Sequence, residues 1–125
     1  MTSPSKPAQS ALACAVAAGD HAATYGFDWP HALDALEKVG EESAELETAI
    51  ATDDGVVEEL GDLLFAACNV ARLLGIDPDD ALQRATRKFE HRFSLVLQRV
   101  EKSGADPRDL SLEELEAIWA DIKTA

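Results

Sequence analysis

The sequence lacks the features that mark several classes of protein. It has only two cysteines, Cys14 and Cys68, and they form no metal-binding spacing. Both fall within apolar helical patterns, so we expect buried or partly buried free thiols in a reducing cytoplasm. No stretch reaches the roughly 18 apolar residues that a membrane span requires, and the Ala-rich run after Lys6 is too short to predict export. We therefore expect a cytoplasmic protein that does not cross a membrane.

Basic residues are also scarce. Eleven Lys and Arg stand against twenty-four Asp and Glu, which gives a formal net charge of −13. Binding to a nucleic-acid polymer or to an anionic membrane needs a basic surface, so this balance argues against both partners. A substrate that carries phosphates would need metal ions and a few well-placed cations to offset the negative charge locally.

Strand patterns are missing as well, because no segment alternates apolar and polar residues. The 46% apolar content suits one compact domain over residues 8–125, preceded by a disordered tail over residues 1–7. The predicted class is all-α: a four-helix-bundle-like fold with a short additional C-terminal helix. The helical periodicity predicts helices over about 9–24, 28–51, 56–74 and 78–102, and a fifth that begins after residue 111.

Helix-capping residues support these boundaries. Asp28 and Asp77 are expected to cap the second and fourth helices, with Pro78 in the first helical position. The turn over residues 52–55 offers an Asp cap to the third helix. Ser111 and Glu114 have the spacing of a capping box.

The third helix is predicted to lie at the centre of the bundle, because it is apolar almost all round beyond Glu59. Asp62 should then sit in an apolar setting, where an unpaired carboxylate is costly and needs a cationic partner. The fourth helix should face the core with the stripe Leu82, Ala85, Phe89, Phe93, Val96 and Val100.

Two acidic sets stand out on the second and third helices. Glu42 with Glu45, and Glu59 with Asp62, each place two carboxylates on one helix face. Like charges at this spacing disfavour a bare helix by about 0.2–0.5 kcal/mol per pair, and a bound divalent cation would offset that cost. Oxygen ligands without His or Cys favour a hard cation, so we expect Mg²⁺ first and Mn²⁺ as a substitute.

Four segments together resemble a known family. They are GFDW (Gly26–Trp29), EESAE (Glu41–Glu45), ELGD (Glu59–Asp62) and KFEHRF (Lys88–Phe93). The combination is similar to the MazG family of all-α nucleoside triphosphate pyrophosphohydrolases, whose pattern is E-E-x-x-E followed by E-x-x-D. Either half alone is common on acidic helices, but both at this spacing are fairly specific.

The resemblance implies roles for individual residues. By position, the magnesium ligands would be Glu42, Glu45, Glu59 and Asp62. Glu41 and Glu58 match positions that support the site as outer ligands or as the base for the attacking water. The cations that hold the phosphates would be Lys38, Lys88 and Arg92, and Trp119 lies where the C-terminal segment of the family approaches the nucleotide.

The resemblance also implies an activity and an assembly. Ribo- or deoxyribonucleoside triphosphates would be hydrolysed to the monophosphate and pyrophosphate, in sanitation or regulation of the nucleotide pool. A homodimer is expected, with association into a tetramer left open. A related specificity, for phosphoribosyl-ATP or a deoxyuridine nucleotide, is an alternative that only a substrate panel resolves.

Other interpretations of the same residues remain open. The acidic face could belong to a catalytically silent helical module that binds a protein partner. Lys88 and Arg92 could be ordinary cations whose stems cover the edge of the core, and Trp119 could fill the core beneath the last helix. A di-iron bundle is disfavoured, because the Glu-x-x-His motif of that class does not occur.

Overall fold

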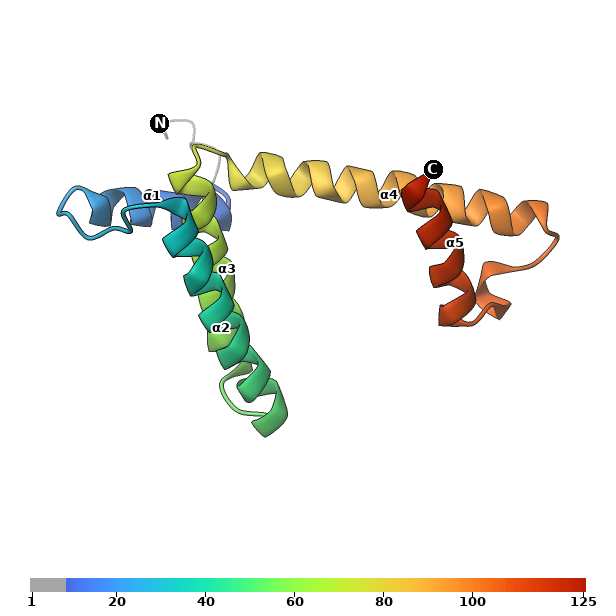
Figure 1. Cartoon of the computed structure of the whole chain (residues 1–125), viewed down its shortest axis with the longest axis horizontal. Coiled ribbons are helices and arrows are strands. Elements are labelled where there is room, and N and C mark those ends of the chain that lie inside the picture. The colour runs from blue at the N-terminus through green and yellow to red at the C-terminus, as the bar shows by residue number, and fades with distance from the viewer. Residues whose placement is uncertain (1–8) are drawn as a thin grey trace, which may run out of the picture. The chain divides into compact units, whose positions relative to one another are not determined.

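The computed structural model describes residues 9–125, and over this range it confirms the all-α class (Figure 1). The prediction of a disordered tail over residues 1–7 lies outside the described residues. None of the described helices is long and apolar enough to span a membrane. The elements are α1 (Ala11–Ala23), α2 (Ala32–Thr52), α3 (Val56–Leu73), α4 (Pro78–Lys102), the short 3₁₀ helix η1 (Pro107–Asp109) and α5 (Leu112–Thr124).

The chain divides into two compact units, with the division between Ala81 and Leu82. The first unit contains α1, α2, α3 and the first turn of α4. The second contains the rest of α4 together with η1 and α5. Because α4 continues across the division, each unit is described by itself, and a single domain over residues 8–125 stays a prediction.

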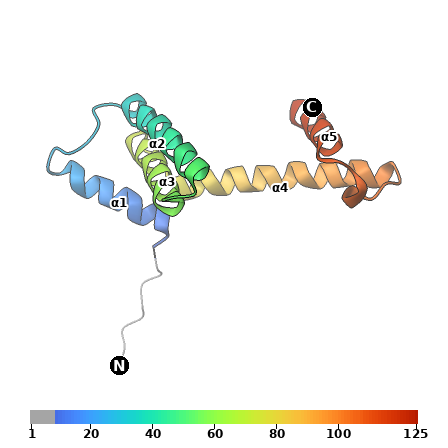
Figure 2. The same ribbon diagram turned by 90° about the horizontal axis from the view of Figure 1, so that it is seen from below.

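In the first unit, α2 and α3 lie side by side and α1 contacts α3 (Figures 1 and 2). The turn between α2 and α3 is tight, and Asp53 and Gly55 both adopt left-handed backbone conformations with φ of 52° and 71°. Gly55, which lacks a Cβ, takes the N-cap position of α3, so the expected Asp cap is wrong. This hairpin brings the acidic segments of the two helices together.

The predicted start of α2 is also wrong. The helix begins at Ala32 with His31 as an N-cap that makes no side-chain hydrogen bond. Asp28 caps no helix, because its carboxylate instead accepts hydrogen bonds from the guanidinium of Arg72 in α3. Trp29 precedes Pro30, and the residue before a proline avoids the helical region of the backbone. The segment between α1 and α2 is therefore longer than expected.

The caps of the later helices are confirmed. The Oδ1 atom of Asp77 accepts a 2.9 Å hydrogen bond from the backbone N–H of Asp79, next to Pro78 at the first position of α4. Ser111 and Glu114 form the complete capping box of α5, with hydrogen bonds of 3.1 and 3.2 Å. Local sequence was sufficient here because both partners lie within three residues.

Burial differs from the sequence-based expectation. Cys68 is buried as predicted, but Cys14 is exposed. In the second unit, Val96, Val100 and Ile122 form the core, so only part of the predicted α4 stripe is buried. The other large apolar side chains of the α4 stripe are exposed, as are several of α3, including Leu82, Phe89, Phe93, Leu60, Leu64 and Phe65.

Because α1 and α2 cover only part of α3, that helix is not enclosed on all sides. Asp62 is exposed, so the apolar setting predicted for its carboxylate is absent from the single chain.

Candidate metal centre

Three carboxylates meet between α2 and α3. Glu42, Glu45 and Glu59 each offer an oxygen, and these oxygens all lie within 4.8 Å of one another. Glu42 and Glu45 come from successive turns of α2, and Glu59 comes from the first turns of α3. Glu42 is only 6% exposed, whereas Glu59 is half-buried and Glu45 is exposed. The cluster therefore opens to solvent on one side.

Two of these carboxylates carry a buried oxygen with no hydrogen-bond partner. The atoms are Oε2 of Glu42 and Oε2 of Glu59. Leaving a buried polar atom unsatisfied costs about 1–3 kcal/mol, and more when the group is charged. A carboxylate is an acceptor only, so the missing partner must be a proton donor or a cation. An all-oxygen donor set of this kind fits a hard divalent cation.

Lys38 of α2 contacts one carboxylate of the cluster. Its Nζ lies 3.0 Å from Oε1 of Glu42 and 3.4 Å from Oε2 of Glu41. The hydrogen bond to Glu42 raises the pKa of Lys38, with a smaller contribution from Glu41. Lys38 thus holds Oε1 of Glu42 and leaves the buried Oε2 without a partner.

The neighbouring carboxylates raise the pKa of Glu45. The hydrogen bond and charge of Glu42 raise this pKa above its ordinary value of 4.5, and Glu59 adds a smaller effect in the same direction. A proton shared among these groups relieves repulsion between like charges. Protons and a cation would therefore compete for the same oxygens.

The remaining predicted acids lie outside this group of three. Glu41 is exposed and pairs with Lys38, Glu58 is exposed, and Asp62 follows Glu59 by one turn without joining the cluster. Their proposed roles as ligands or bases stay predictions.

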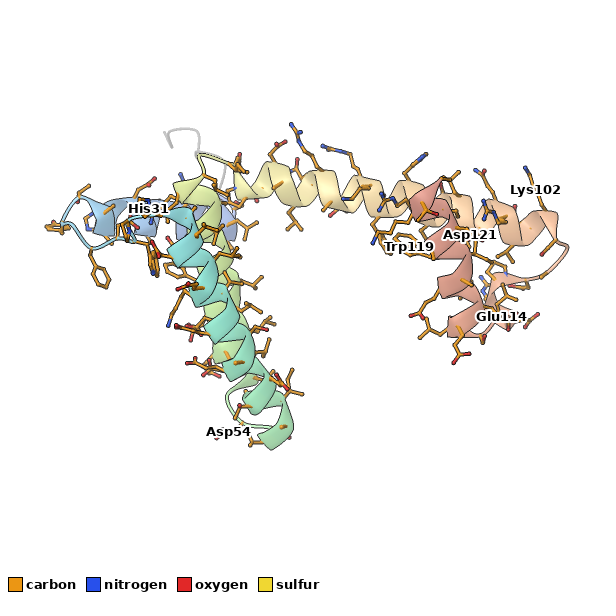
Figure 3. All side chains as sticks on the ribbon, viewed as in Figure 1. His31, Asp54, Lys102, Glu114, Trp119 and Asp121 are labelled. Carbon is orange, nitrogen blue, oxygen red and sulfur yellow. The ribbon has the colours of Figure 1, made fainter. Side chains whose placement is uncertain are left out.

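The predicted phosphate-binding residues of α4 and the tryptophan of α5 belong to the second unit. Lys88 is exposed and Arg92 is half-buried on α4. Trp119 packs against the core, and its ring centroid lies 5.3 Å from that of Phe89 (Figure 3). This packing favours the interpretation of Trp119 as a core side chain. Nucleotide contact by any of the three stays a prediction.

A pocket that the sequence analysis did not identify lies beside Lys38. It has a volume of about 350 Å³ and is lined by Phe27, Asp28, Trp29 and Lys38. The motif GFDW was noted only as part of a family resemblance. The available signal was a pair of aromatic residues, Phe27 and Trp29, followed by a cation about two turns into the next helix. An aromatic wall beside a cation suits a planar ring with a charged substituent.

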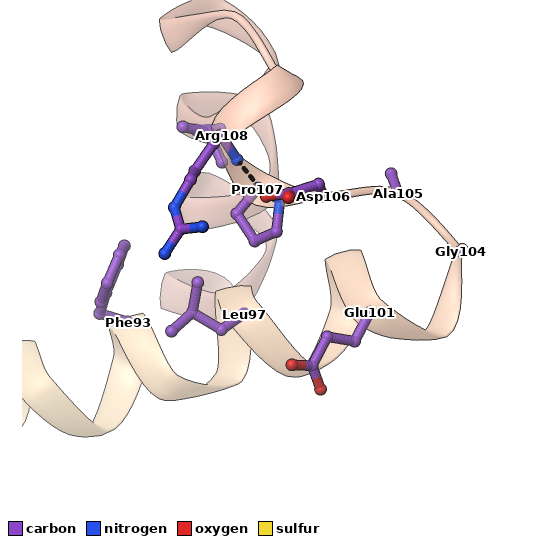
Figure 4. A pocket seen from close by; sticks show the side chains of 9 residues that line it. Phe93, Leu97, Glu101, Gly104, Ala105, Asp106, Pro107 and Arg108 are labelled. Atoms are coloured by element: carbon purple, nitrogen blue, oxygen red, sulfur yellow. Dashed lines mark hydrogen bonds between the residues drawn. The ribbon is translucent and has the colours of Figure 1, made fainter.

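A second pocket, of about 700 Å³, lies within the second unit (Figure 4). The backbone N–H of Arg108 donates a 2.9 Å hydrogen bond to Asp106, and its guanidinium points toward Phe93 and Leu97. None of the predicted site residues lines this pocket.

The chain is therefore an all-α protein with a candidate metal centre, formed by the carboxylates that face each other between α2 and α3. The family model described as the MazG nucleotide pyrophosphohydrolase domain matches residues 32–96, more than half of the chain. The chain therefore belongs to the MazG family. The match contains all three clustered carboxylates and runs across the division between the two units.

Named relatives agree with this assignment. The nucleoside triphosphate pyrophosphohydrolase/pyrophosphatase MazG of Thermotoga maritima is 38% identical over 117 residues, which is 94% of this chain and 46% of the relative. The nucleoside triphosphate pyrophosphohydrolase of Escherichia coli K12 is 39% identical over 105 residues, 81% of this chain and 40% of the relative. The chain thus spans less than half the length of both.

A further relative matches a shorter segment of the chain. The phosphoribosyl-ATP pyrophosphatase of Methylococcus capsulatus is 41% identical over 58 residues, which is 43% of this chain and 53% of that protein.

Proposed function

We propose that this chain hydrolyses ribo- or deoxyribonucleoside triphosphates to the monophosphate and pyrophosphate with Mg²⁺ as cofactor, and so controls the composition of the nucleotide pool. Family membership and the names of the relatives support the reaction class. The observation that carries the proposal is the pair of buried, unpartnered oxygens of Glu42 and Glu59 beside Glu45. A bound cation would partner these acceptors, and it would also neutralise the charge of a triphosphate.

The cation would be held by Glu42, Glu45 and Glu59, with Asp62 as a fourth ligand by family resemblance. Mg²⁺ bound in this position would neutralise the charge of phosphate oxygens and lower the pKa of a bound water. Mn²⁺ prefers the same oxygen ligands and is expected to substitute for it.

The protein itself would supply the base and the cations. Glu41 or Glu58 would accept the proton of the attacking water, because both are exposed carboxylates next to the cluster in sequence. Lys38 lies beside the ligand Glu42 and could also bind a phosphate oxygen. Lys88 and Arg92 would stabilise the negative charge that develops on the leaving pyrophosphate.

The pocket beside Lys38 would receive the nucleoside. Phe27 and Trp29 offer aromatic surface to a base, and Lys38 joins this pocket to the carboxylate cluster through Glu42. A triphosphate bound at the cluster would therefore have space for its nucleoside on the adjacent side.

We also propose that the chain forms a homodimer that can associate into a tetramer, in the cytoplasm. Large apolar side chains on α2 and α3 remain exposed in the single chain, including Leu33, Leu36, Leu60 and Leu64. Large apolar side chains exposed on two neighbouring helices favour an interface. A second copy of the chain would cover it, in keeping with the family resemblance.

A substrate panel tests the reaction. The protein is incubated with ribo-, deoxyribo- and oxidised nucleoside triphosphates, with deoxyuridine triphosphate and with phosphoribosyl-ATP, each with Mg²⁺ or chelator. Pyrophosphate and orthophosphate are measured separately. We expect pyrophosphate release that requires metal, and a preference for phosphoribosyl-ATP would assign the chain to the chemistry named for the Methylococcus relative.

Substitutions of single acidic residues test whether the metal centre carries the activity. Glu42→Gln and Asp62→Asn should abolish pyrophosphate release, whereas Glu47→Gln, an exposed acid on α2 outside the cluster, should not. Orthophosphate as the main product would move the reaction to the terminal phosphate. Turnover that survives both Glu42→Gln and Asp62→Asn would refute the metal assignment. Complete inactivity of a folded, metal-loaded protein would favour the non-catalytic interaction module.

A further inference from the structure

The side chain of Arg72, at the end of α3, is buried, with only 7% of its surface exposed. Its Nη1 donates a 3.0 Å hydrogen bond to Oδ2 of Asp28, and its Nη2 donates to Oδ1 of the same carboxylate. Its Nε donates a 3.0 Å hydrogen bond to Oδ1 of Asn69, and Asp20 lies 3.7 Å away. The guanidinium therefore connects α3, α1 and the segment between α1 and α2.

The surrounding helices leave room for this guanidinium. A Cβ atom built on Gly19 of α1 would lie 2.5 Å from Nε of Arg72 and 2.5 Å from Oδ1 of Asn69. Any side chain at this position would displace the arginine or the helix. Gly19 is the only glycine of the described chain whose added Cβ would meet another atom within 4 Å. The absence of a side chain at Gly19 thus allows α1 to lie close to Arg72 of α3.

The partner of Arg72 also fixes the wall of the nucleoside pocket. Oδ1 of Asp28 accepts a 2.9 Å hydrogen bond from the backbone N–H of Trp29. Asp28 and Trp29 both line the pocket beside Lys38, whose ammonium lies 3.0 Å from Glu42. The pocket therefore shares one lining residue, Asp28, with the ion pair of Arg72 and another, Lys38, with the ion pair of the candidate ligand Glu42.

The end of α1 holds only the first half of this segment, because the backbone N–H groups of residues 25–27 donate hydrogen bonds to the carbonyls of Ala22 and Ala23. Residues 24–31 form no regular helix, Tyr25 is 79% exposed and Phe27 is 80% exposed. Apolar burial therefore contributes little to its order, whereas a two-pronged contact between a guanidinium and a carboxylate is strong and directional. Beyond residue 27, the ion pair with Arg72 ties the segment to α3.

From these contacts we infer that Arg72 is a positioning residue for substrate binding: through Asp28 it orders the Trp29 segment and so shapes the pocket that receives the nucleoside. This inference rests on the proposed function. Arg72 contacts none of the three clustered carboxylates, so its effect should fall on binding of the nucleoside and not on the metal-dependent step.

Kinetic constants of Arg72→Met and Asp28→Asn test this role. Each substitution should raise KM for the preferred triphosphate about tenfold, with kcat within about threefold of wild type, as when a binding interaction common to ground and transition states is lost. The double variant should be no worse than the single variants, because both remove one contact. Arg99→Met is the matched control: Arg99 pairs with Asp121 at 3.7 Å in the second unit and is half exposed, and its KM should not change.

Fluorescence of Trp29 gives a readout that needs no turnover. In a Trp119→Phe background, Trp29 is the only tryptophan, and acrylamide should quench it more strongly after Arg72→Met or Asp28→Asn. Asp28→Asn keeps the inference testable if Arg72→Met does not fold, because Asp28 is partly exposed at 22%.

The outcomes separate the two proposals. An active wild type whose KM and Trp29 quenching are unchanged in Asp28→Asn would overturn the role of Arg72 while leaving the proposed function intact. A loss of kcat at constant KM would also overturn it, since the contact would then act on the chemical step. A metal-loaded wild type that hydrolyses no substrate would instead refute the proposed function, and unchanged quenching would still refute the ordering of the segment.

Discussion

Glu42 of α2 and Glu59 of α3 each direct a buried carboxylate oxygen into the same helical interface, and neither oxygen has a hydrogen-bond partner among the described residues. One carboxylate oxygen of Glu45 lies within 4.8 Å of one oxygen of each of these two residues. Folding the hairpin brings these like charges together. The cost of that arrangement makes the stability of the protein sensitive to metal, to pH and to packing of the hairpin.

A divalent cation should stabilise the folded chain. At a Mg²⁺ concentration about ten times Kd, linkage adds about 1.4 kcal/mol, which raises Tm by about 6–11 °C in a small domain. Glu42→Gln should abolish this rise, and Glu47→Gln should retain it, because only Glu42 belongs to the cluster. Thermal melting with metal or chelator measures the effect. Equal shifts in both variants would indicate screening of a solvated acidic surface.

The metal-free protein should lose stability as pH rises through the acidic range. The folded pKa of Glu45 is raised above 4.5, chiefly by Glu42, so its favourable contribution is complete below 4.5 and disappears as pH rises through the folded value. Glu59 and Lys38 also face the cluster, and Lys38 stays protonated throughout. Urea unfolding in chelator, from about pH 4 to about pH 7, should show a smaller decline in Glu45→Gln than in wild type.

Metal affinity should follow the opposite trend. As pH falls into the same window, protons compete for the oxygens of Glu45, so Mg²⁺ binding weakens and binding releases a proton. Calorimetric titration in two buffers of different ionisation enthalpy detects that proton. Binding without proton release at the folded pKa of Glu45 would exclude this residue as a ligand.

Gly19→Ala should destabilise the protein. The added methyl group would lie 2.5 Å from Nε of Arg72, and overpacking of this kind costs about 1–3 kcal/mol. Gly40→Ala in α2 is the matched control, because nothing lies within 4 Å of its added Cβ. In a helix interior this control should stabilise by about 0.5–1 kcal/mol. Chemical denaturation of both variants measures the difference, and a neutral Gly19→Ala would show that α1 moves freely away from α3.

The proposed homodimer should depend on the exposed apolar side chains of the hairpin. Leu36 is 51% exposed and Leu64 is 52% exposed in the single chain. Replacing either with Glu places a charge on a surface that association would bury, so the variants should shift toward monomer. Light scattering coupled to gel filtration gives the mass of each. A monomeric wild type at micromolar concentration would contradict the prediction.

Local patterns predicted the helices well, and their failures have physical causes. The capping box at Ser111 and the cap at Asp77 were correct because each is completed within three residues. Asp28 had an equally good local signal but binds Arg72, forty-four residues away. A charged partner at that distance outweighs an N-cap, and no local pattern reveals it.

In the candidate site, too, local sequence predicted some features and helix packing decided the others. The spacing of Glu42, Glu45 and Glu59 predicted which faces of the helices carry acids, because helical periodicity alone fixes the face. Which oxygen is buried, and that Asp62 remains exposed outside the group, depends on how deeply the two helices pack. The pocket at Trp29 likewise depends on how the segment before α2 lies beside Lys38, and no local pattern determines that.

The sequence by itself determined the helical class, most helix ends and the acidic faces of α2 and α3, since each depends on residues within one or two turns. Only the tertiary structure decided that Glu42 and Glu59 keep unpartnered oxygens, and that Arg72 holds Asp28 beside the pocket. These relationships join residues distant in the chain, and the balance between burial, charge and hydrogen bonding that creates them exists only once the helices have packed.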